Sequence, residues 1–279
     1  MNWDNAQNAN IFSQKPLREP IVLHGDVCGV NAAKDDVNIQ SIADTVGHDV
    51  SVPVFDVGKQ SVDGKWTLGR YEQYFESTDK SALVSARFSI RDTAMESIWD
   101  ITPPSIVQQL SLTNSVWPRS LPSPPRVDLY CLISPKDAFI DSHVDMSGSA
   151  SYHHILSGSQ IYYLVQPTPT NLRRYELWQQ SSSSSSNPKQ SSQKQSKFFS
   201  DVFGDSIVKQ QLSEGNTLII PHGWIYAVLT TGDSIVINGN FMSSQDLGIQ
   251  TRVADMEQRL RVPASDQFPR FSEHLWHTA

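Results

Sequence analysis

Residues 214–244 have the sequence EGNTLIIPHGWIYAVLTTGDSIVINGNFMSS, and this stretch decides the fold class. It contains three short runs rich in β-branched and aromatic residues, NTLIIP (216–221), WIYAVL (224–229) and DSIVIN (233–238). Glycine, proline or aspartate separates these runs. This composition predicts short β-strands joined by tight turns.

Two further strand-like runs lie upstream, VDLYCLIS (127–134) and QIYYLV (160–165). Several short strands at close spacing predict a sandwich or a barrel, of which a jelly roll is one form. Tight turns favour glycine because it tolerates positive φ. The glycines at the expected turns are Gly158, Gly215, Gly223 and Gly232.

Helices are expected on both sides of this β-rich region. Pro104 is typical of a helix start, and a second helix is expected over 169–180. A third is predicted near the C-terminus, where apolar residues recur at spacings of four, three and four. Those residues are Ile249, Val253, Met256 and Leu260.

The chain divides into four parts by composition. Residues 1–19 are polar and expected to be disordered, and 20–126 form a region of short strands and helices. The barrel is expected over 127–262, with a disordered insertion at 181–197 where serine, glutamine and lysine replace almost all apolar residues. Residues 263–279 are expected to form a C-terminal helical segment.

The composition limits the possible partners. The chain has 279 residues, 38% of them hydrophobic, and a formal net charge of −7. A nucleic-acid-binding surface is not expected because such surfaces carry a basic stripe, whereas an acidic chain suits a cationic peptide. The sequence contains no stretch of about 18 apolar residues, so no membrane span is predicted. Cys28 and Cys131 are far apart in sequence and are expected to be buried thiols.

His143 and Asp145 form the first candidate metal-binding motif. On an extended segment, side chains two residues apart point the same way, so this pair could bind one ion. A His-x-Asp pair with a distant third ligand is typical of non-haem iron oxygenases. The motif alone is weak, since a histidine in a surface turn gives the same pattern.

The sequence around this motif resembles the JmjC core of the lysine-demethylase 2 and 7 families. In those families a His-x-Asp segment leads into a Pro-Thr-x-x-Asn-Leu helix, and a Gly-Trp-Ile-His-Ala-Val strand follows later. The resemblance implies a mainly β fold with flanking helices, the double-stranded β-helix of JmjC and cupin proteins. The blocks that carry it are GKWTLGRYEQYFES (64–77), SARFSIRD (85–92), 103–121, 143–178 and 214–244.

The chain departs from the family at the positions that bind cofactors. The resemblance implies an iron site of His143, Asp145 and a second histidine, but Tyr226 occupies that third position. The family binds the far carboxylate of 2-oxoglutarate with a lysine, a threonine and a tyrosine. The matching residues here are Gln160, Ile140 and His153.

These changes predict weak or lost binding of Fe(II) and 2-oxoglutarate. A tyrosine is a poor ligand unless the metal removes its proton. Leaving a buried charge without its partner costs about 3–5 kcal/mol, and Gln160 provides no charge. His154 is expected to be structural, and His222 lies about 13 Å from Tyr226 on an extended strand, which makes it a poor substitute ligand.

Three functions are compatible with this pattern. The first is a nuclear JmjC chromatin regulator that acts on heterochromatin or histone methylation mainly by non-catalytic binding of histone tails or chromatin proteins. In this respect the chain is similar to the degenerate fungal anti-silencing JmjC proteins. The second is an active Fe(II)/2-oxoglutarate-dependent histone lysine demethylase with a rewired pocket. The third, a small-molecule cupin hydroxylase, is disfavoured because the resemblance extends outside the barrel.

Overall fold

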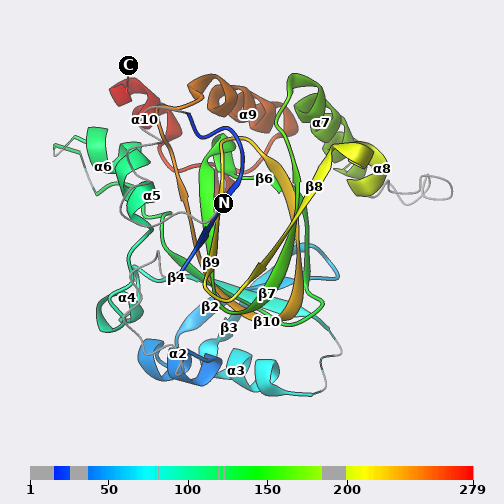
Figure 1. Cartoon of the computed structure of the whole chain (residues 1–279). Coiled ribbons are helices and arrows are strands. Elements are labelled where there is room, and N and C mark those ends of the chain that lie inside the picture. The colour runs from blue at the N-terminus through cyan, green and yellow to red at the C-terminus, as the bar shows by residue number, and fades with distance from the viewer. Residues whose placement is uncertain are drawn as a thin grey trace.

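The computed structural model describes residues 16–25, 37–78, 80, 82–118, 120–121, 123–183 and 199–278. These residues form ten strands and several helices around them (Figure 1). The strands are β1 (Ile21–His24), β2 (Ser51–Asp56), β3 (Ser61–Thr67), β4 (Val84–Ser89), β5 (Tyr130–Ser134), β6 (Phe139–Val144), β7 (Ala150–Val165), β8 (Ile207–Ser213), β9 (Asn216–Ile220) and β10 (Ile225–Phe241).

Helices precede, interrupt and follow the strands. The first group is α2 (Ile39–Val46), α3 (Leu68–Glu76), α4 (Met95–Ile98), α5 (Ser105–Leu110) and α6 (Leu112–Val116). The second group is α7 (Pro169–Ser183), α8 (Phe199–Phe203), α9 (Leu247–Leu260) and α10 (Phe271–Thr278). Short 3₁₀ turns lie at Met146–Gly148, Gly204–Ser206 and Ala264–Asp266.

The long strands β7 and β10 pair antiparallel along nearly their whole length and belong to two facing sheets. Residues 225–229 of β10 also pair with β6, and the C-terminal half of β7 pairs with β8. The other halves continue through β9 to β1 on one side and through β5, β4 and β2 to β3 on the other. This is the double-stranded β-helix expected from the sequence, and the fold class is confirmed.

The expected turns at Gly158 and Gly232 are wrong, because Gly158 lies inside β7, and residues 225–229 and 233–238 belong to the single strand β10. The strand instead bends through register shifts between Thr230 and Ile235. Gly158 of β7 lies against this bend with φ +83°, and a Cβ there would lie 2.0 Å from the carbonyl oxygen of Asp233. The close approach of the two strands therefore requires glycine at this position.

Three hydrophobic clusters define the layers of the molecule. One covers the outer face of the larger sheet and joins Cys131 and Ile133 to helix residues such as Ile42 and Tyr71. Another covers the outer face of the smaller sheet with residues of α7, α8 and α9. A third lies inside the barrel. In Figure 1, α7 and α9 lie over one end of the barrel and α2 and α3 at the opposite end.

The bounds of the two segments expected to be disordered differ from those in the structure. Residues 16–19 of the N-terminal segment are described, and Leu17 is buried there, with its N–H donating to Gln245 Oε1 at 2.7 Å. Ser181–Ser183 continue α7, so the first three residues of the expected insertion are helical. Residues 1–15, 184–197 and Cys28 lie outside the described residues.

The C-terminal pattern and the helix near Pro104 both appear as helices. The four apolar residues of the C-terminal pattern lie on or at the end of α9, and Val253 and Met256 are buried. The segment after Pro104 forms two short helices, α5 and α6, where a single one was expected. Of the described helices, none has the length and apolarity that a membrane crossing requires.

Candidate metal and cofactor site

The structure brings His143, Asp145 and Tyr226 together at one end of the barrel. β6 pairs with β10 so that His143 faces Tyr226, and their ring centroids are 4.3 Å apart. Asp145 follows β6 directly, and the Tyr226 hydroxyl donates to its carboxylate, 3.0 Å from each oxygen. Side chains 81 residues apart in sequence are therefore in direct contact.

The orientation of His143 suits a metal ligand. Its Nδ1 lies 3.0 Å from the backbone carbonyl oxygen of Asp141. A carbonyl oxygen only accepts, so Nδ1 carries the hydrogen and Nε2 of the neutral ring keeps a lone pair. Metal-binding histidines are commonly oriented by such a bond. His143 and Asp145 are both partly exposed, so this end of the barrel can be reached from solvent.

Tyr226 is the weak member of the three. Its side chain is 2% exposed, and burial, followed by the negative charge of Asp145, raises its pKa well above the usual value. The phenol is thus a neutral donor that must lose its proton before it can bind a metal ion strongly. In the part of the chain that the structure describes, no group of three or more His, Cys, Asp or Glu residues is placed to hold a metal. The three side chains fit a metal ion only as one imidazole, one carboxylate and one phenol.

The opposite part of the interior does not fit 2-oxoglutarate. Gln160 is 1% exposed, and its amide bonds to neighbouring hydroxyl groups. Tyr162 donates to Gln160 Oε1 at 2.8 Å, and Gln160 Nε2 donates to Ser234 Oγ at 3.0 Å and to Thr230 Oγ1 at 3.4 Å. Ile140 packs against the apolar cluster inside the barrel. None of these residues carries a positive charge for a carboxylate.

His153 provides no positive charge either. It is 5% exposed, with Nε2 3.3 Å from Ser151 Oγ and 3.5 Å from the Tyr226 hydroxyl. Burial lowers the pKa of His153 to about 4, and the nearby His143 and Arg87 act in the same direction against Asp145. The imidazole is therefore neutral near pH 7. His153 contacts Tyr226 among the metal-ligand candidates, whereas Gln160 bonds to the hydroxyl groups of Tyr162, Ser234 and Thr230.

His154 and His222 both bond to other groups of the protein. His154 Nδ1 is 2.8 Å from Thr217 Oγ1. His222 uses both nitrogen atoms, with Nδ1 3.1 Å from the Gly148 carbonyl oxygen and Nε2 2.7 Å from Ser243 Oγ. Burial lowers the pKa of His222 to about 4.

Two features of the site have no counterpart in the sequence-based expectations. Glu257 on α9 accepts bonds from the N–H of Ser147 at 2.6 Å and from its hydroxyl at 3.1 Å. This holds Ser147 at φ 50°, in the turn that follows Asp145. The second feature is the cationic side chain of Arg87 on β4. The sequence contained a signal for its position, because Arg87 alternates with Ser85 and Ser89 and alternate residues of a strand share one face.

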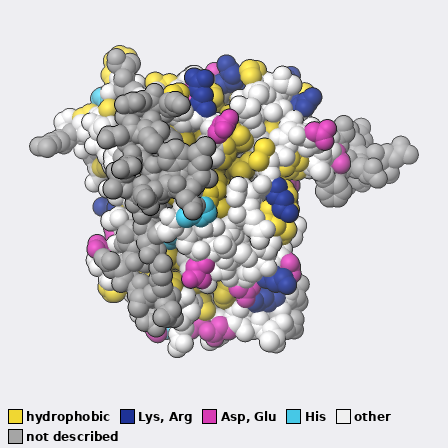
Figure 2. Space-filling view, in the orientation of Figure 1, with side chains coloured by type: hydrophobic (Ala, Val, Ile, Leu, Met, Phe, Trp, Pro, Cys, Tyr) yellow, Lys and Arg dark blue, Asp and Glu magenta, His cyan; other side chains and the backbone are white. Residues whose placement is uncertain are grey.

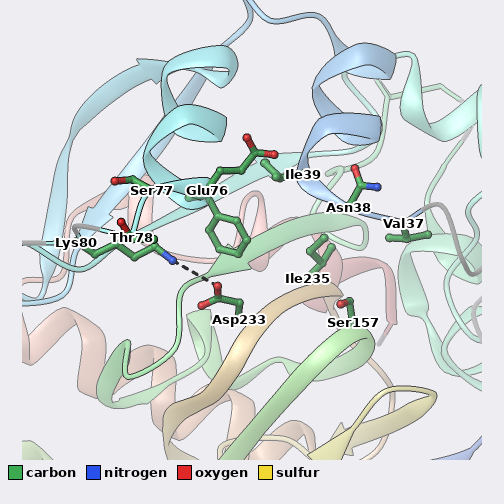
Figure 3. Close-up of a pocket in the computed structure, with 11 residues that line it drawn as sticks. Val37, Asn38, Ile39, Glu76, Ser77, Thr78, Lys80, Ser157, Asp233 and Ile235 are labelled. Atoms are coloured by element: carbon green, nitrogen blue, oxygen red, sulfur yellow. Dashed lines mark hydrogen bonds and ion pairs between the residues drawn. The ribbon is translucent and has the colours of Figure 1, made fainter.

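Three pockets on the surface lie away from His143, Asp145 and Tyr226. The one in Figure 3 has a volume of about 570 Å³ and lies beside α3 and the bend of β10, where Lys80 Nζ is 3.3 Å from Asp233 Oδ2. Another, of about 680 Å³, lies between the start of β1 and β8. Figure 2 shows the molecule in the orientation of Figure 1, with apolar side chains on the visible face and acidic and basic ones scattered over it. The third, of about 300 Å³, is lined by His222 and Asp246.

Comparison with known proteins extends over nearly the whole chain. Residues 130–241 match the JmjC domain, described as a hydroxylase domain. Histone lysine demethylase PHF8 of Danio rerio is 34% identical over 264 residues, 92% of this chain and 24% of that protein. Lysine-specific demethylase 7B of Danio rerio is 35% identical over 268 residues, 94% of this chain and 44% of that protein.

A fungal relative is similar over the same region. JmjC domain-containing histone demethylation protein 1 of Yarrowia lipolytica is 30% identical over 274 residues, which cover 95% of this chain and 52% of that protein. The chain thus spans between about a quarter and about half the length of these relatives.

Proposed function

This chain belongs to the JmjC-domain proteins related to histone lysine demethylases, and we propose that it is a chromatin regulator that acts mainly by binding rather than by demethylation. Its partners are histone tails or chromatin proteins in the nucleus, where it influences heterochromatin or histone methylation. The net charge of −7 favours a cationic partner of this kind.

The observation that carries this proposal is that Gln160, neutral and bonded to neighbouring hydroxyl groups, stands where the family has a lysine. Oxidative demethylation needs 2-oxoglutarate with its far carboxylate neutralised, because an unpaired buried charge is strongly penalised. Gln160 is neutral, and its amide is used by Tyr162 and Ser234. His153 is neutral and Ile140 apolar. None of the three replaces the missing cation.

The metal-ligand candidates support a reduced role for iron. His143, Asp145 and Tyr226 would hold a divalent ion, which in this family activates oxygen. The ion has to displace the phenol proton and break the bond between Tyr226 and Asp145. Both costs weaken binding relative to an intact pair of histidines and one carboxylate. We expect metal binding that is measurable and weak.

An active demethylase with a rewired pocket is the alternative function. The observation that favours it is the orientation of His143, whose Nδ1 bond to Asp141 leaves Nε2 directed for ligation. This alternative requires another cation in the interior to hold the cosubstrate, and Arg87 on the interior face of β4 is the candidate.

Formaldehyde release tests the proposal. The purified chain is incubated with methylated histone tail peptides, Fe(II), ascorbate and 2-oxoglutarate, beside His143→Ala and Tyr226→His. We expect no release above that of His143→Ala, and no rescue by Tyr226→His. In parallel, fluorescence polarisation should give equal peptide affinities for the wild type and His143→Ala. Release that depends on 2-oxoglutarate and disappears in His143→Ala would reject the proposal in favour of the alternative.

A further inference from the structure

A row of polar residues crosses the inner face of the larger sheet. Ser89 of β4 pairs with Tyr130 of β5, Tyr130 with Asn238 of β10, and Asn238 with His153 of β7. Residues in register on neighbouring strands project from the same face of a sheet. That face is the barrel interior, because the next pairs along it, such as Leu132 and Val236, belong to the interior cluster.

Several polar atoms in and beside this row lack partners among the described residues. Ser89 Oγ, Asn238 Oδ1 and His153 Nδ1 in the row, and Nε of Arg87 two residues before Ser89, are buried and form no hydrogen bond there. Asn238 is 8% exposed and His153 5% exposed. Buried polar groups are nearly always paired, so several unpaired atoms on one face indicate a polar guest. Gln160, by contrast, is fully paired.

Arg87 brings a positive charge beside the row. It pairs with Leu132 of β5, the next pair along the same face, and its guanidinium carbon lies 3.9 Å from the centre of the Tyr130 ring in the row. None of the ion pairs formed among the described residues involves Arg87. A guanidinium fork without a carboxylate partner matches the two oxygens of a carboxylate ligand.

We propose that this row is a binding site for a small carboxylic acid, held by Arg87 with Asn238 and Ser89 as further polar contacts. The site lies on the β4 side of the interior and does not use Gln160. It ends at His153, which contacts Tyr226, so the bound acid shares the barrel interior with the metal-ligand candidates. The proposal goes beyond the proposed function, since a carboxylate can bind here whether or not demethylation occurs.

Calorimetric titration of the purified chain with succinate tests the site, with and without Mn(II). We expect saturable binding that Arg87→Gln weakens by at least about 10-fold, the loss of one charge-assisted contact. Arg87→Lys should give an intermediate affinity, because it keeps the charge and loses the fork. Thermal unfolding of each variant, with and without succinate, separates lost binding from lost folding.

A matched control accompanies these variants. Arg126→Gln removes the same charge from an exposed position, where Arg126 is 3.8 Å from Asp92, and should leave the affinity unchanged. Absence of succinate binding by the wild type, or binding that Arg87→Gln leaves intact, would overturn the proposal. Formaldehyde release with Arg87-dependent binding would overturn only the proposed function.

Discussion

The two polar regions of the barrel interior differ in how their hydrogen bonds are satisfied. Around Gln160, every interior contact of the amide is made by a hydroxyl group of the protein. Along the row from Ser89 to His153 and at the neighbouring Arg87, four buried atoms have no partner among the described residues. In the first region the Gln160 amide is paired, and Ser134 Oγ opposite Ser234 is the atom left without a partner there. Substitution should therefore destabilise the first region and stabilise the second, since unpaired polar groups cost stability and are retained at functional sites.

The strongest test of the comparison is Gln160→Lys, which restores the residue type that the family uses. We expect a loss of about 4 kcal/mol in the free energy of unfolding at pH 7, because the new charge is buried without a counterion. Urea unfolding measures it. Gln211→Lys, on the exposed side of β8, is the control and should change stability by less than about 0.5 kcal/mol. A Gln160→Lys protein as stable as the wild type would show that this region is open to solvent or ions.

His222 is a further buried group whose hydrogen bonds are satisfied, and it can also gain a proton. Its folded-state pKa of about 4 lies below the unfolded value of about 6.5, so the unfolded chain binds the proton more readily between these values. The stability from neutral His222 is complete above pH 6.5 and is lost as the pH falls toward 4, by about 3 kcal/mol. Unfolding curves of the wild type and His222→Gln between pH 4 and 7 measure this. His277→Gln is the exposed control, and equal pH slopes for the wild type and His222→Gln would contradict the expectation.

Gln160→Leu removes the amide without adding charge. The Tyr162 hydroxyl, which donates to Gln160, then loses its acceptor inside the barrel. We expect a loss of about 2 kcal/mol by urea unfolding, the cost of an unsatisfied buried donor. The double variant Gln160→Leu with Tyr162→Phe should recover part of that loss, because both partners are then apolar. Failure to recover any of it would mean that packing, and not the hydrogen bond, sets the cost.

Asn238→Leu makes the corresponding change in the unsatisfied row. Asn238 Oδ1 has no partner, so an apolar side chain of similar size should raise the free energy of unfolding by about 1 kcal/mol. Thermal unfolding in buffer without added carboxylates measures the gain. If Asn238→Leu instead destabilised the protein by about as much as Gln160→Leu, the region around Gln160 and the row from Ser89 to His153 would not differ in the way described.

The sequence was sufficient for the fold and for the convergence of the three metal-ligand candidates. The runs in 214–244 carry the strand signal, and the resemblance aligns His143 and Asp145 with Tyr226. The bend of β10 was misinterpreted as a turn because glycine favours both, and only the approach of Asp233 to Gly158 distinguishes them. A role of His143, Asp145 and Tyr226 in metal binding is still a prediction.

The row from Ser89 to His153, with Arg87 beside it, was beyond sequence reasoning. Its members come from four strands between residues 84 and 241, and only the register of those strands brings them together. The closure around Gln160 was closer to prediction, since Tyr162 lies two residues away on the same face of β7. What the sequence did not reveal is that the tyrosine hydroxyl donates to the oxygen of the Gln160 amide.

The pairing of β4 with β5 has a consequence for how this protein can be divided. β5 begins at Tyr130, where the match to the JmjC domain also begins, and its other neighbour is β10. A fragment cut to that match would lose β4 and expose a row of unpaired backbone groups along β5, beside the apolar outer face around Cys131 and Ile133. Open strand edges of this kind recruit other chains. Such a fragment is therefore expected to aggregate, and soluble material requires the residues before it.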